Sequence, residues 1–153
     1  MSRAADVAAA IVTRLQGVRL ANGFETDIGR MVYRGKRGLD ESSLPCVVLI
    51  EADDVAEPRG TTRNSLNTCS ITAPYYIEAH LACDPDHPND AAHLAIADIK
   101  RALFALSDHQ YGGLLSQGLT YRGRTIEPRE PGVAAVAVAV RIEAHYVESL
   151  ENP

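Results

Sequence analysis

Apolar residues recur along the chain at two different spacings, which predict helices and strands. Spacings of three and four residues predict two amphipathic helices, over residues 2–20 and 90–107. The segment 21–23 ends the first helix because its Asn and Gly accept a left-handed backbone. The buried stripes are Val7, Ile11, Leu15 and Val18 in the first helix, and Ala92, Ile96, Ile99, Leu103 and Leu106 in the second.

The other apolar segments alternate with polar residues or run unbroken, as strands do. Strict alternation predicts half-buried strands over residues 68–81 and 133–147, and the second is far longer than an average strand. An unbroken apolar run at residues 46–50 predicts a strand that is buried on both faces. Shorter strands are expected at 28–34 and 119–126.

Three features interrupt this regular pattern. Residues 54–67 carry Pro, Gly and Asn without a period, and they predict a long mobile loop between two strands. Residues 148–153 predict a short flexible tail. Pro74 lies inside an alternating segment, and because proline cannot donate to a ladder, it predicts a bulge or a sheet edge.

The order of these elements predicts a single α+β domain over residues 1–153. Its expected core is a mainly antiparallel or mixed β-sheet with two α-helices packed on one face. The tetrapeptide Ile-Glu-Ala-His occurs at 77–80 and again at 142–145, which suits two core strands that could be neighbours. A length of 153 residues with 46% hydrophobic and 23% charged residues is ordinary for one globular domain.

Composition and charge exclude several classes of protein. No run of eighteen apolar residues is present, so no transmembrane helix and no membrane partner are expected. The net charge of −5 argues against a broad nucleic-acid-binding surface, because such surfaces are usually basic. Three widely spaced cysteines favour a reducing compartment over a disulfide scaffold.

Metal-ligating residue types are concentrated around His80, Cys83 and His87. Their spacing, H-x2-C-x3-H, is not a recognised zinc pattern, and the segment also suits a turn that caps a helix. A Cys83 thiolate paired with a histidine is another alternative. No P-loop, Gly-x-Ser-x-Gly or His-Glu-x-x-His motif occurs. We therefore expect no metal, no cofactor and no enzymatic activity.

Charged residues gather at two further places. A basic cluster surrounds a predicted turn, and an acidic cluster follows the strand at 46–50. The basic cluster is a solvated turn, a protein interface or a nucleic-acid contact, and the acidic chain as a whole disfavours the last. The basic residues are Arg30, Arg34, Lys36 and Arg37, and the acidic ones are Glu51, Asp53 and Asp54.

Several local signatures follow one another over roughly residues 5–148. They are Met-Val-Tyr-Arg-Gly-Lys-Arg-Gly at 31–38, Leu-Pro-Cys-Val-Val-Leu-Ile at 44–50, a strand at 76–80, Ala-Asp-Ile-Lys-Arg-Ala-Leu at 97–103, Gly-Gly-Leu at 112–114 and a final strand with tyrosine. In this order they resemble the tail terminator, or tail completion, proteins of long-tailed bacteriophages, including the minor tail protein U type.

The resemblance implies a small α/β domain that assembles into a six-fold ring. Such a ring caps the end of the tail tube, ends tail polymerisation and provides the surface that joins the head. The implied partners are further copies of the chain, the tail tube protein and a head–tail connector protein, in a virion tail assembled in the bacterial cytoplasm. The alternative is a small metal- or nucleic-acid-binding accessory domain of a mobile element.

A ring also needs a heterologous contact, in which two different patches meet around an axis. We expect the basic and acidic clusters to form this contact between neighbouring subunits. The loop 54–67 and the turn 34–38 are expected to order on assembly. The residues expected at the interface are Arg34, Lys36 and Arg37 on one subunit and Glu51, Asp53 and Asp54 on the next.

Overall fold

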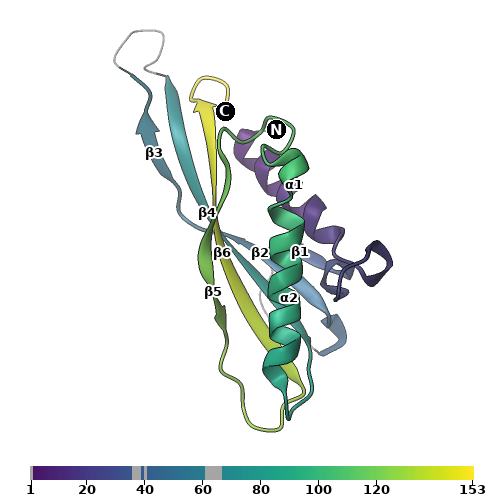
Figure 1. Cartoon of the computed structure of the whole chain (residues 1–153). Helices are drawn as coiled ribbons and strands as arrows, with labels where there is room; N and C mark the ends of the chain where they lie inside the picture. Colours follow the sequence, from purple (N-terminus) through teal and green to yellow (C-terminus); the bar gives the residue numbers. More distant parts are fainter. Residues whose placement is uncertain (1, 36–38, 40, 61–66) are drawn as a thin grey trace.

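The computed structural model describes residues 2–35, 39, 41–60 and 67–153, which form a six-stranded mixed sheet with two α-helices on one face (Figure 1). This confirms the predicted α+β fold. The strand order is β1-β2-β4-β6-β5, and β3 also pairs with β4. The helices are α1 (Arg3–Gln16) and α2 (Pro88–Leu103), and the strands are β1 (Val32–Arg34), β2 (Cys46–Glu51), β3 (Val55–Pro58), β4 (Thr68–Ala82), β5 (Gly118–Ile126) and β6 (Ala135–Ser149).

Two long antiparallel strands, β4 and β6, form the centre of the sheet. Each has 15 residues, and their pairing runs without interruption from Thr68–Ser149 to Ala82–Ala135. The two Ile-Glu-Ala-His copies therefore lie on neighbouring strands. Figure 1 shows that the ends of β3, β4 and β6 extend beyond the layer of helices.

Both helices are shorter than their apolar stripes predict. Ser2 caps α1 by accepting from the backbone N–H of Ala5, and the helix ends at Gln16. The second helix ends at Leu103, whose carbonyl accepts from the Tyr111 hydroxyl at 2.8 Å instead of from a further helical turn. Leu106, predicted to be in the buried stripe, is 90% exposed.

The main core fills the space between the helices and the sheet. Alternate residues of β4 and β6 face the helices, as their period predicts. The predicted burial of the strand at 46–50 is confirmed for Cys46–Leu49, all of which are buried. Large side chains that meet in the main core include Ile11, Leu15, Leu49, Ile77, Ile99, Leu103, Ile142 and Tyr146.

The irregularity predicted at Pro74 is present on one side of β4 only. Pro74 pairs with Glu143 without a shift in register. On its other side, β2 and β3 occupy the same edge of β4 in succession, and the break between them falls opposite Pro74. The Pro74 carbonyl accepts from the N–H of Ala52 at 3.1 Å, so proline lies where no further ladder bond is made.

Other boundaries also differ from the predictions. The segment 54–67 contains β3, and its residues 61–66 lie outside the described residues. The expected strand at 28–34 is a short helical turn followed by β1, because Gly29 packs its backbone against the end of α1. The expected tail begins later, since β6 continues to Ser149. No helix in the described ranges is long and apolar enough to span a membrane.

Candidate protein interface

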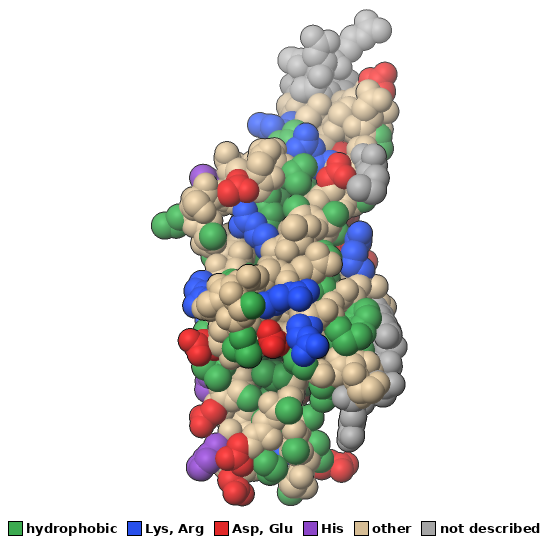
Figure 2. All heavy atoms as spheres, turned by 90° about the vertical axis from the view of Figure 1, so that its right-hand side faces the viewer, with side chains coloured by type: hydrophobic (Ala, Val, Ile, Leu, Met, Phe, Trp, Pro, Cys, Tyr) green, Lys and Arg blue, Asp and Glu red, His purple; other side chains and the backbone are tan. Residues whose placement is uncertain are grey.

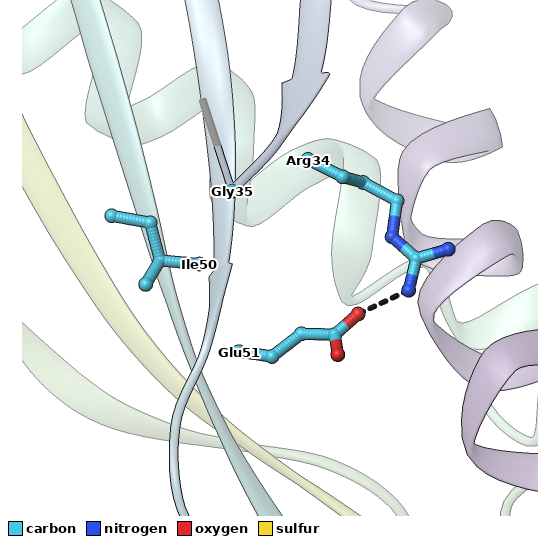
Figure 3. Close-up of a pocket in the computed structure, with 4 residues that line it drawn as sticks. All are labelled: Arg34, Gly35, Ile50 and Glu51. Atoms are coloured by element: carbon cyan, nitrogen blue, oxygen red, sulfur yellow. Dashed lines mark hydrogen bonds and ion pairs between the residues drawn. The ribbon is translucent and has the colours of Figure 1, made fainter. Parts of the chain in front are cut away.

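Arg34 and Glu51 lie on adjacent strands at one edge of the sheet. β1 runs parallel to β2, with Arg34 in register with Leu49, and this places the Arg34 guanidinium beside the Glu51 carboxylate. Figure 3 shows the two side chains reaching toward each other while Ile50 points away. The two residues line an open hollow of about 360 Å³ together with Gly35 and Ile50.

Within one chain, Arg34 pairs with Glu51. Its pairing with an acidic residue of a neighbouring subunit stays a prediction. The side chains are 44% and 50% exposed, so solvent screens the pair strongly. Lys36 and Arg37 lie outside the described residues. The structure thus brings together one basic and one acidic residue of the expected set.

Asp53 and Asp54 follow Glu51 in the short link between β2 and β3. Both are exposed, and in the described part of the chain neither forms an ion pair. The whole of β3 is exposed as well, including Val55 at 58%. This edge therefore carries two carboxylates that form no ion pair in the described chain, and beside them the exposed apolar side chain of Val55.

Two buried tyrosines lie on the helix-facing side of the sheet near this acidic edge. Tyr75 is in register with Glu51, and burial raises its pKa well above the usual value, with further contributions from Tyr146 and Glu51. Burial likewise raises the pKa of Tyr146 to about 12, assisted by the charges of Glu148 and Asp54. Both hydroxyls therefore stay neutral at physiological pH, and neither is a general base there.

The possible metal cluster is a turn and helix start. His80 lies on β4, while the Asp84 carboxylate accepts from the N–H of Asp86 at 2.9 Å and shapes the turn before α2. The helix begins at Pro88, a residue that suits a first helical position. Among the residues that the structure describes, no three His, Cys, Asp or Glu side chains are grouped to hold a metal ion.

A row of polar contacts crosses the sheet face opposite the helices, and sequence reasoning did not identify it. The His145 ring lies between Thr72, at 3.3 Å, and Thr120, at 2.9 Å. Arg122 pairs with Glu143 at 2.8 Å on the same face. The alternating polar residues of β6 were the available signal. These groups satisfy one another within the chain, which leaves them less available to a partner.

Charge is also uneven over the side of the molecule that carries α1 and β1. Figure 2 shows Lys and Arg side chains across the middle of this side and Asp and Glu side chains toward its lower end.

Comparison with protein-family models found no match, and none of the curated proteins compared matched the chain.

Proposed function

We propose that this protein is a structural subunit that joins further copies of itself in a ring at the end of a phage or prophage tail tube. The ring would end polymerisation of the tube and present the surface that joins the head. The observation that carries the proposal is the exposed edge at Asp53, Asp54 and β3. It is charged and exposed, and Asp53 and Asp54 have no ion-pair partner in the described chain.

The layered architecture gives the proposal further support. Two helices cover one face of the sheet, and in the described chain no α-helix covers the opposite face (Figure 1). The two edges differ in sequence and charge, and unlike patches on one subunit favour head-to-tail contacts that can close into a ring. The resemblance of the local signatures to phage tail terminators supplies the location, a tail end.

Removal of the coding region from its phage or prophage tests this function directly. We expect tails of uncontrolled length that fail to join heads, as seen by electron microscopy, and restoration of normal tails when the wild-type protein is supplied from a plasmid. A variant with two exposed acids changed outside Asp53, Asp54 and β3, E130K/E151K, should restore them equally well. Normal tails joined to heads in the deletion strain would overturn the proposal.

A further inference from the structure

A basic and aromatic patch lies at the opposite edge of the sheet, between α2 and β5. The Lys100 ammonium lies 4.4 Å from the centroid of the Tyr121 ring. Phe104 packs edge-on against the same ring, with centroids 6.4 Å apart and an angle of 87°. Tyr121 is 38% exposed, so its ring is accessible to a partner beside the cation.

A β-bulge brings a second cation to this patch. Tyr121 pairs with Ile142, but the register then shifts so that Arg124 pairs with Val140. Ile142 and Val140 face the same side of β6, and therefore Tyr121 and Arg124 also share one face although they are three residues apart.

The extra residue of the bulge, Arg122, turns to the other face and pairs with Glu143 there. The bulge thus places Arg122, which is ion-paired, on one face of the sheet and Arg124 on the other face with the patch. In the described ranges, neither Lys100 nor Arg124 forms an ion pair.

Asp53 and Asp54 lie at the opposite edge of the sheet from Lys100 and Arg124. β6 and then β5 follow β4 on one side, whereas β2 and β3 share the other side. The charges of Arg14, Arg34 and Arg122 are already paired with acidic residues in the chain. Neither patch is ion-paired in the described chain and their charges are opposite, so the two edges are complementary to each other.

We propose that Asp53 and Asp54 of one copy bind Lys100 and Arg124 of a second copy, with the exposed Val55 against the Tyr121 ring. This interface rests on the proposed ring function and specifies which surfaces form it. Because the two patches differ, each copy uses both, and the contact is head-to-tail. Electrostatic pairing of this kind fixes the partner and the register.

Carbodiimide cross-linking tests the contact, because it joins a carboxylate to a lysine without a spacer. The chain has only two lysines, Lys36 and Lys100, so a cross-linked peptide is assigned without ambiguity. In a mixture of 14N- and 15N-labelled protein, we expect a mixed-isotope peptide that joins Lys100 to Asp53 or Asp54. K100R should abolish it. Mixed-isotope products at Lys36 alone, or none at either lysine, would overturn the interface.

Charge reversal provides a second, independent measurement. D53K/D54K and K100E/R124E should each weaken self-association at least about tenfold in analytical ultracentrifugation at low salt, because like charges then meet. A mixture of the two variants should associate as well as the wild type, since each reversed edge meets its complement on the other variant. The control E130K/E151K carries the same charge change as D53K/D54K and should associate normally.

The outcomes separate this interface from the proposed function. If the reversals leave association unchanged, or if the mixture fails to recover it while both variants unfold at the wild-type urea concentration, the interface is wrong. A ring built through other surfaces would then still give normal tail lengths in the deletion strain that carries these variants. The ring function itself is wrong only if the deletion strain, which lacks the protein, makes normal tails joined to heads.

Discussion

Asp98 and the pair Asp53 and Asp54 are carboxylates in opposite surroundings. Asp98 is 2% exposed, and its carboxylate accepts from the backbone N–H groups of Glu25 and Thr26 and from the Thr26 hydroxyl, at 3.0, 2.8 and 2.8 Å. Asp53 and Asp54 are exposed and have no ion-pair partner in the described residues. One carboxylate ties α2 to the segment after α1, and the other two are left for solvent or for a second molecule.

The difference shows how the same residue type serves stability at one place and contact at another. A buried carboxylate persists only when its hydrogen bonds are satisfied, so Asp98 is explained entirely within the chain. An exposed acidic pair adds little to folding, so its carboxylates remain available for a contact outside the chain, which is the role that we propose for them. Each prediction below alters one side of this comparison.

The largest expected effect is that of Asp98→Ala. Its loss leaves the buried N–H and hydroxyl of Thr26 and the partly buried N–H of Glu25 without their acceptor, and we expect the free energy of unfolding to fall by about 3 kcal/mol. Urea denaturation followed by circular dichroism measures it. Asp98→Asn, which keeps one acceptor oxygen, should lose about half as much. A change below about 1 kcal/mol in the alanine variant would show that water replaces the carboxylate.

At alkaline pH, the acidic edge affects the core because the charge of Asp54 raises the pKa of the buried Tyr146. The pKa of this tyrosine is raised from 10.0 to about 12, by burial first and by Glu148 and Asp54 next. Because the folded state favours the neutral hydroxyl, its contribution to stability is complete below pH 10 and is lost as the pH rises toward 12.

We expect unfolding in this pH range to coincide with the rise in tyrosinate absorbance, and Tyr146→Phe should move the midpoint to higher pH. Asp54→Asn should lower the pKa of Tyr146, because it removes one nearby negative charge. Ionisation of Tyr146 at an ordinary tyrosine pKa in the folded protein would contradict the prediction.

Periodicity predicted the long strands well because both keep a strict alternation that the core enforces. It overextended α2, since the spacing of Leu106 fits the helical stripe, whereas the Leu103 carbonyl accepts from the Tyr111 hydroxyl and from the guanidinium of Arg14 in α1. It missed β3, whose four residues are all exposed and so carry no burial pattern. In each case the missing information is a contact made by residues far apart in sequence.

The candidate site was only partly accessible from sequence for a related reason. Clusters of opposite charge indicate that pairs will form, but they do not say whether the partner belongs to the same chain. The parallel pairing of β1 with β2 decides this for Arg34 and Glu51. The sequence did not predict the patch at Lys100 and Arg124, because the patch depends on a β-bulge in β5. The spacing of apolar and polar residues gave no sign of this bulge.

The pair of Arg34 and Glu51 lies between the two extremes of the comparison, since it is satisfied but exposed. A double-mutant cycle with Arg34→Gln and Glu51→Gln should give a coupling energy of about 0.5 kcal/mol at low salt. Urea denaturation of the four proteins supplies the values, and added salt should reduce the coupling. A coupling energy well above about 1 kcal/mol would mean that this pair stabilises the fold, as Asp98 does.

The smallest effect on stability is expected for D53N/D54N. Neither carboxylate forms an ion pair in the described chain, so the free energy of unfolding should change by less than about 0.5 kcal/mol. Self-association should nevertheless weaken and lose much of its dependence on salt, because two charges are removed without a change in shape. Glu130 and Glu151 changed to glutamine serve as the matched control. A loss of more than 1 kcal/mol in D53N/D54N would show that these acids hold the fold together, and the contrast with Asp98 would then disappear.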